Sequence, residues 1–144
     1  MTKAILLVED SPQDEKLILR ALRKVDLDRE VEVARDGRQA LDYLFREGEF
    51  TGRTGSNQPH LIILDINMPR IGGINVLKRV RNDPRTRLIP VVVFSSSDEE
   101  RDRLSCYENG ASSFVQKPLD FDEFAENVTH MGLYWLNANC PPSG

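Results

Sequence analysis

Glu9, Asp10, Asp65 and Lys117 each stand at the end of a short apolar run, where a buried strand would end. In the stretch LLVEDSPQDE two carboxylates follow Val8 without a spacer, and Asp65 follows LIIL in the same way. Carboxylates that share a site repel and raise one another's pKa unless their charge is compensated. Mg²⁺ would compensate it, because this ion prefers oxygen ligands and takes only a few of them from protein. The residue types therefore indicate a magnesium site, provided that the fold brings these residues together.

Five apolar runs are candidates for the strands that would do so: AILLV at 4–8, VEVA at 31–34, LIILD at 61–65, VVVFS at 91–95 and SFVQ at 113–116. Apolar residues at helical spacing fill the intervals: Leu17 to Val25, Ala40 to Phe45, Val76 to Val80, a helix capped by Asp98 and ended by Asn109-Gly110, and a last helix from about Asp120. Nearly continuous Val, Ile and Leu runs are typical of parallel strands covered on both faces. Strand–helix alternation with right-handed crossovers predicts an α/β doubly wound sheet. Five strands favour the flavodoxin-like order 2-1-3-4-5.

In this order the sheet has its switch point between the first and third strands, and ligands bind beyond the carboxyl ends of the strands there. Glu9, Asp10 and Asp65 would then meet in one crevice. Ser95 ends the fourth strand and Lys117 follows the fifth, so both would face the same crevice. Each residue alone also fits an ordinary surface acid, a turn serine or a solvated lysine. Their joint placement favours a single site.

The length and composition fit one globular domain spanning residues 1–144, with no linker to an output domain. The chain has 19 basic and 23 acidic side chains, a net charge of −4, which gives no electrostatic footprint for nucleic acid. No apolar run is long enough to span a membrane, and residues 1–20 are too charged for a signal peptide. Cys106 and Cys140 are too few for a disulfide framework. We expect a cytoplasmic protein, with residues 46–60 as a mobile surface loop.

The sequence resembles the receiver domain of two-component response regulators from about Lys3 to about Val128. The residues that carry this resemblance are Glu9-Asp10, Asp65 with Pro69 and Gly73 behind it, Ser95, Phe114 and Lys117-Pro118. The spacing of the first motif, the long loop before the third strand and the ending with Trp135 resemble the small single-domain regulators of phytochrome-type histidine kinases. Another sensor or hybrid kinase is the alternative partner.

This resemblance implies a role for each site residue. Asp65 would accept a phosphoryl group from a kinase histidine. Asp10 would bind Mg²⁺ directly, Glu9 through water, and Asn67 through its backbone carbonyl. A second set of residues would contact the phosphoryl group or respond to it: Ser95, Lys117 and Phe114. Phe114 fits a simple core residue about equally well.

Two other classes of protein fit the sequence less well. A phosphatase with an aspartyl-phosphate intermediate needs a general acid/base; in the haloacid-dehalogenase type this is an Asp two residues beyond the nucleophile. Asn67 stands there and cannot transfer protons, so we expect no enzyme activity beyond slow self-dephosphorylation. A flavodoxin-like cofactor binder needs a neutral phosphate cradle after the first strand, whereas EDSPQDE is acidic and would repel phosphate.

The C-terminal helix is expected to form a homodimer. Its apolar positions make one seam suited to packing on the sheet: Phe121, Phe124, Val128, Met131 and Trp135. Further apolar residues lie off this seam, and clustered exposed apolar groups usually mark an interface. A two-fold pairing would bury Tyr134, Trp135 and Leu136 against the partner chain. The alternative is that this tail folds back on its own domain.

Overall fold

A computed structural model describes residues 5–26, 29–53, 58–68 and 70–142, and contains one parallel sheet. Its five strands are β1 (Ile5–Val8), β2 (Val31–Ala34), β3 (Leu61–Leu64), β4 (Val91–Ser95) and β5 (Ser113–Gln116). Their order is β2-β1-β3-β4-β5. The predicted doubly wound fold and strand order are confirmed. Ala4, the predicted first residue of β1, lies outside the described residues.

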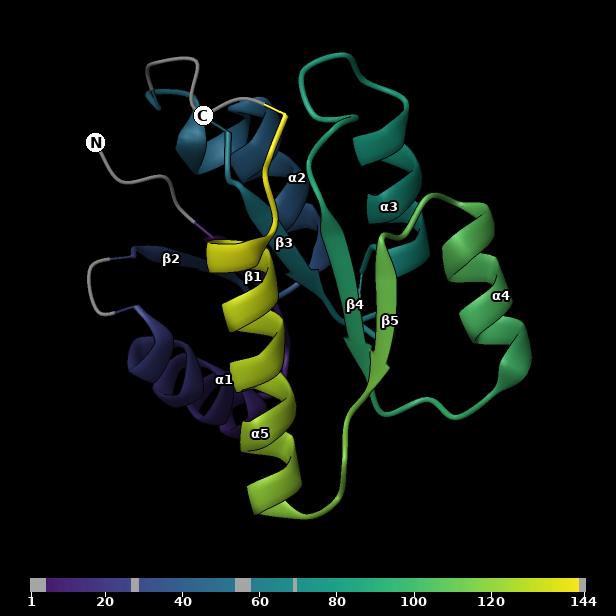
Figure 1. Cartoon of the computed structure of the whole chain (residues 1–144). Coiled ribbons are helices and arrows are strands. Elements are labelled where there is room, and N and C mark those ends of the chain that lie inside the picture. Colours follow the sequence, from purple (N-terminus) through teal and green to yellow (C-terminus); the bar gives the residue numbers. More distant parts are fainter. Residues whose placement is uncertain (1–4, 27–28, 54–57, 69, 143–144) are drawn as a thin grey trace.

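Within the described ranges, five α-helices alternate with the strands: α1 (Pro12–Val25), α2 (Gly37–Phe45), α3 (Gly73–Arg81), α4 (Glu100–Glu108) and α5 (Phe121–Gly132). In Figure 1, α5 lies in front of the sheet with α1 beside it, while β4 and β5 point to the lower edge of the sheet. Helices α2 and α3 pack against each other, and α3 contacts α4. The carboxyl ends of the strands therefore meet at one edge, where the acidic residues follow them.

The sheet core follows the two-residue alternation of the strands. Ile5 and Leu7 of β1 pack toward α1 and α5, with apolar residues that include Ile18 and Phe124. Leu6 and Val8 pack on the opposite side with α2 and α3. Burial on both faces explains why β1, β3 and β4 are almost purely aliphatic.

Helix α4 begins one residue later than predicted, because Glu99 rather than Asp98 stands at its N-cap. The side chain of Ser97 satisfies this end of the helix: its hydroxyl accepts the Glu99 N–H and donates to Asp102 Oδ2 at 2.6 Å. Helix α5 begins next to Asp120, near the predicted start, and the Asp120 side chain caps it by accepting the Glu123 N–H.

The C-terminal segment departs from the predicted regular helix. Leu133–Ala138 form a π-helical turn after α5, marked by the bond from the Asn139 N–H to the Tyr134 carbonyl. This wider winding lets Trp135 and Leu136 both pack, half-buried, against the core of their own domain. Tyr134 stays exposed. The predicted seam is wrong at Phe121, which is 60% exposed and lies in a groove between α1 and α5.

The long loop before β3 is anchored where the structure describes it. A short 3₁₀ turn, η1 (Gly48–Phe50), places the Phe50 ring against Tyr43 at 5.2 Å between centroids. The Arg53 guanidinium lies 4.3 Å from the centre of the Tyr43 ring and donates to the Tyr43 carbonyl. The mobile excursion predicted for residues 46–60 is therefore not supported for these anchored residues, while 54–57 lie outside the described residues.

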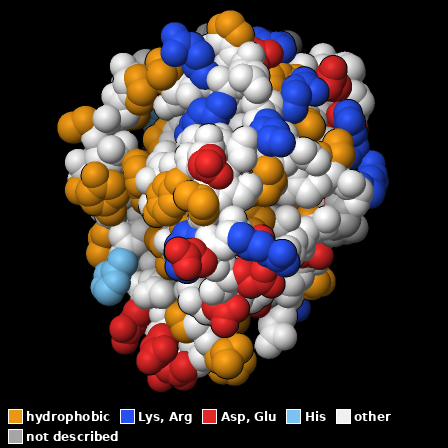
Figure 2. All heavy atoms as spheres, turned by 90° about the vertical axis from the view of Figure 1, so that its right-hand side faces the viewer, with side chains coloured by type: hydrophobic (Ala, Val, Ile, Leu, Met, Phe, Trp, Pro, Cys, Tyr) orange, Lys and Arg blue, Asp and Glu red, His pale blue; other side chains and the backbone are white. Residues whose placement is uncertain are grey.

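Among the described residues, no helix is both long and apolar enough to cross a bilayer. On the face that includes α4, acidic side chains gather mostly in the lower half and basic ones mostly in the upper half (Figure 2). The lower half corresponds to the edge where β4 and β5 end in Figure 1. On this face, the negative charge therefore lies mostly toward the carboxyl ends of β4 and β5.

Candidate functional site

Three carboxylates meet at the carboxyl ends of β1 and β3. One oxygen from each of Glu9, Asp10 and Asp65 lies within 4.8 Å of the other two. Two adjacent parallel strands bring them there: Val8 pairs with Leu64, and the Asp65 N–H bonds to the Val8 carbonyl. Glu9 and Asp65 are buried, and Asp10 is exposed. The predicted convergence of the three acids is therefore present in the fold.

Lys117 reaches into the same cluster from the end of β5. Its Nζ lies 2.7 Å from Glu9 Oε1, 3.0 Å from Asp65 Oδ2 and 2.9 Å from Asp14 Oδ2. The Lys117 N–H bonds to the Ser95 carbonyl at 2.7 Å, which fixes the start of this side chain against the end of β4. Asp14 was not among the residues predicted for this site. An acid in the first turn of a helix usually stabilises the helix N-terminus. Asp14 therefore gave no sign in the sequence of its contact with Lys117.

Burial and charge act in opposite directions on this cluster. Burial raises the pKa of Glu9 to about 7, although Lys117 opposes the rise and the neighbouring Asp65 adds to it. Burial alone would lower the pKa of Lys117, but the carboxylates of Asp14, Glu9 and Asp65 outweigh it and raise that pKa. Lys117 therefore stays charged at neutral pH. A divalent cation would favour the charged form of Glu9 in the same way.

The side chain of Asp65 is held at both oxygens. Oδ2 accepts from Lys117, and Oδ1 accepts from the Asn67 N–H at 3.1 Å. Helix α3 begins close behind, because a Cβ at Gly73 would lie 2.5 Å from the Asp65 carbonyl oxygen. Only glycine permits this approach, so Gly73 brings the start of α3 against the end of β3. Pro69 of the predicted motif lies outside the described residues.

Ser95 lies on β4, the strand next to β3, and Phe114 lies on β5, which pairs with β4. Ser95, the last residue of β4, is fully buried, and its hydroxyl accepts the Ser97 N–H. Phe114 of β5 is half-buried and packs on a small cluster that contains Val93 and Cys106. Its N–H, on the outer edge of the sheet, donates to the Tyr107 hydroxyl of α4 at 3.2 Å. Phe114 thus connects the end of β5 with α4.

The donor set fits a small hard cation. Carboxylate oxygens on one Mg²⁺ lie about 3–4 Å apart, because each sits about 2.1 Å from the metal. The three carboxylates lie within 4.8 Å of one another, so two can bind directly and the third through water. Asp10 is exposed to solvent, whereas Glu9 Oε1 already accepts from Lys117. This arrangement suits direct binding by Asp10 and water-mediated binding by Glu9.

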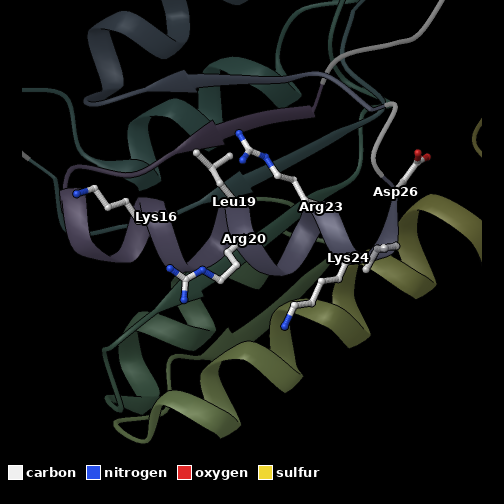
Figure 3. A pocket seen from close by; sticks show the side chains of 7 residues that line it. Lys16, Leu19, Arg20, Arg23, Lys24 and Asp26 are labelled. Atoms are coloured by element: carbon white, nitrogen blue, oxygen red, sulfur yellow. The ribbon is translucent and has the colours of Figure 1, made fainter.

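A separate hollow lies along the outer face of α1. Four exposed cations surround it: Lys16, Arg20, Arg23 and Lys24. Figure 3 shows their side chains extending from successive turns of the helix, with Leu19 between them. None of the four forms an ion pair with another described residue. A basic surface thus flanks the acidic site on the helix that follows Asp10.

The protein is thus a doubly wound α/β domain. Acidic residues and a lysine lie together at the carboxyl ends of the strands. A family model of the response regulator receiver domain matches residues 5–129. The chain belongs to this family, whose members act in two-component signalling.

Several relatives match along almost the whole chain. The "Probable methanogenesis regulatory protein FilR2" of Methanothrix harundinacea is 37% identical, over 96% of this chain and 86% of its own. "Response regulator Rcp1" of Synechocystis is 33% identical, over 98% of this chain and 94% of its own. Its Mn²⁺-bound crystal structure superposes with a TM-score of 0.91. The crystal structure of the phosphorylated "Cyanobacterial Phytochrome Response Regulator RcpA" is 35% identical in sequence, over 99% of this chain and 100% of its own, with a TM-score of 0.92. The expected similarity to phytochrome response regulators is therefore confirmed.

Proposed function

We propose that this protein is a response regulator in which Asp65 accepts a phosphoryl group from a histidine kinase. The observation that carries this proposal is the carboxylate of Asp65, buried among Glu9, Asp10 and Lys117 with a donor on each of its own oxygens. In the reaction, an Asp65 oxygen forms a bond to phosphorus while the P–N bond of the phosphohistidine breaks. The kinase imidazole leaves as its neutral form after taking up a proton.

The residues around Asp65 supply positioning and charge, which dominate the catalysis of phosphoryl transfer. Lys117 would pair with one phosphoryl oxygen, and the Ser95 hydroxyl would donate to another. Mg²⁺, held by Asp10, Asp65, the Asn67 carbonyl and, through water, Glu9, would neutralise negative charge on the transferred group. Asn67 offers no general acid/base, so we expect only slow self-dephosphorylation and no enzymatic turnover.

Phosphorylation would act on the surface around β5. The new group adds about −1.5 to −2 charges near neutral pH, so Ser95 and Lys117 would move toward it. Phe114 would follow, because it lies on β5 between Lys117 and α4. Ser95→Ala should leave labelling of Asp65 largely intact and reduce the chemical-shift changes that phosphorylation causes near Phe114. Unaltered shift changes in this variant would contradict the switch.

The partner we propose is a phytochrome-type histidine kinase, in the cytoplasm. The support is the likeness to RcpA and Rcp1 along nearly the whole chain. The similarity to FilR2 leaves another sensor kinase as the alternative. Phosphotransfer from each histidine kinase of the source organism would distinguish them: the cognate kinase should transfer fastest. Preference for a kinase without a phytochrome sensor would contradict this partner.

We also propose a homodimer built by the C-terminal helix, on the face formed by β4, α4, β5 and α5. Exposed apolar side chains lie on α4, just before α5 and on the C-terminal π-helical turn: Leu104, Tyr107, Leu119, Leu133 and Tyr134. Of the three residues named for the dimer, Tyr134 is exposed and free to contact a partner chain. Trp135 and Leu136 are half-buried in their own domain, so their share in a contact would be limited to their outer edges.

A further inference from the structure

The ammonium group of Lys117 has three hydrogen-bond partners, one for each of its N–H donors. These are Glu9 Oε1, Asp14 Oδ2 and Asp65 Oδ2, at 2.7, 2.9 and 3.0 Å. The Lys117 side chain is only 6% exposed. Its position is therefore set by three carboxylates from three different segments of the chain.

Asp14 differs from the other two partners in its surroundings. Glu9 and Asp65 belong to the carboxylate cluster suited to a cation, and Asp14 does not. The Asp14 side chain is 28% exposed, compared with 1% for Glu9 and 9% for Asp65. Its backbone is fixed in the first turn of α1, where its N–H bonds to the Ser11 hydroxyl.

We propose that Asp14 is a positioning residue that holds the Lys117 ammonium at the site throughout the phosphorylation cycle. The proposal rests on the function proposed for Asp65. When a phosphoryl group and a cation engage Asp65 and Glu9, these two carboxylates lose part of their hold on Lys117. Asp14 remains as the anchor, so Lys117 meets the phosphoryl oxygen with little loss of conformational freedom.

This anchor also joins two segments that the sequence separates widely. Asp14 belongs to α1, whereas Lys117 lies between β5 and α5. Their contact bridges 103 positions and lies beside the packed pair of α1 and α5. The orientation of Lys117 therefore depends on the first turn of α1 as well as on β5.

The first test measures binding of a phosphoryl analogue. In Asp14→Ala with Mg²⁺ present, affinity for beryllium trifluoride should fall about tenfold, because a charge-assisted hydrogen bond that orients Lys117 is lost. Glu15→Ala is the matched control, since Glu15 lies in the same turn and pairs with Arg35 instead. Asp14→Glu should recover part of the affinity. Unchanged or tighter binding in Asp14→Ala would overturn the proposal.

The second test needs neither metal nor phosphoryl group. The ammonium ¹⁵N signal of Lys117, assigned by its loss in Lys117→Met, should be protected from exchange with water in the metal-free protein. Asp14→Ala should broaden this signal or speed its exchange, and Glu15→Ala should not. Equal protection in the wild type, Asp14→Ala and Glu15→Ala would overturn the proposal that Asp14 anchors Lys117. If the wild type is not labelled on Asp65, the proposed function fails, while this signal still tests the contact itself.

Discussion

At the scale of single residues, Lys117 determines the charge balance of the site. It contacts Glu9, Asp14 and Asp65, and two of these carboxylates are almost completely buried. Removing one partner from a buried ion pair is far more costly than losing a surface pair, because it leaves an uncompensated charge. The stability of the metal-free protein should therefore depend on this lysine.

Lys117→Met tests this dependence. In a chelator, the free energy of unfolding should fall by about 3 kcal/mol. Mg²⁺ should restore part of the loss, because the cation compensates the same carboxylates. Urea denaturation with and without Mg²⁺ measures both effects. Lys24→Met is the control, because Lys24 is exposed and has no ion pair among the described residues. Equal stability of the two variants in chelator would contradict this charge balance.

The acids of the site could be predicted from the sequence, but the contact between Asp14 and Lys117 could not. Glu9, Asp10 and Asp65 were recognisable because carboxylates directly after aliphatic strands conflict with ordinary packing. Asp14 was not, since an acid in the first turn of a helix already has a local explanation. Its contact with Lys117 spans 103 positions and depends on how α1 meets the end of β5, which no local pattern contains.

At the scale of elements, the strands were predictable and the helix ends were less so. The bounds of β2, β4 and β5 match the prediction. Strand β4 is buried on both faces and almost purely aliphatic, whereas β2 and β5 lie at the edges of the sheet and are only partly buried. The start of α4 was displaced by one residue through the bonds of Ser97. Leu136, predicted to contact a partner chain, packs on the core of its own domain within the π-helical turn after α5. Apolar periodicity did not predict this contact, because it assumes a regular α-helix.

The junction between β3 and α3 offers a prediction at this scale. In Gly73→Ala the added methyl group would lie 2.5 Å from the Asp65 carbonyl oxygen and 2.6 Å from the Ile66 Cα. Backbone atoms cannot rotate away, so the variant should be destabilised by about 1–3 kcal/mol. Labelling of Asp65 by acetyl phosphate should also slow. Gly52→Ala is the control, because nothing lies within 4 Å of its Cβ position. Wild-type stability and labelling in Gly73→Ala would contradict the close approach.

The basic face of α1 leads to another prediction. We expect Arg20 and Lys24 to attract an acidic kinase surface, because both are exposed and lie on the helix that follows Asp10 (Figure 3). The double change Arg20→Glu and Lys24→Glu should slow phosphotransfer from the kinase about tenfold at low salt. Labelling by acetyl phosphate should remain unchanged.

The control for this charge reversal is the double change Lys78→Glu and Arg87→Glu. Both residues are exposed and lie on α3 and the loop after it, away from α1. This variant has the same net charge but should receive phosphoryl groups from the kinase at nearly the wild-type rate. An equal slowing in both variants would mean that overall charge, rather than the α1 face, sets the rate.

At the scale of the whole molecule, the proposed dimer depends on exposed apolar side chains. Leu133 and Tyr134 are 45% and 53% exposed on the C-terminal π-helical turn. Changing both to Ser should shift the protein toward monomer in light scattering, because the apolar area that pairing buries is removed. Asn137→Ser, at an exposed polar position of the same turn, should leave the mass unchanged. A wild type that is monomeric with and without phosphorylation would contradict the dimer.

We propose above that Asp65 accepts the phosphoryl group with the help of a divalent cation. The most direct measurement is the mass of the intact protein after incubation with acetyl phosphate and Mg²⁺, followed by mapping of the labelled residue. The wild type should gain one phosphoryl group on Asp65. Asp65→Asn, a chelator, or Asp10→Ala should each abolish the gain or reduce it strongly. Undiminished labelling of Asp65→Asn, or a label mapped to another residue, would contradict the account.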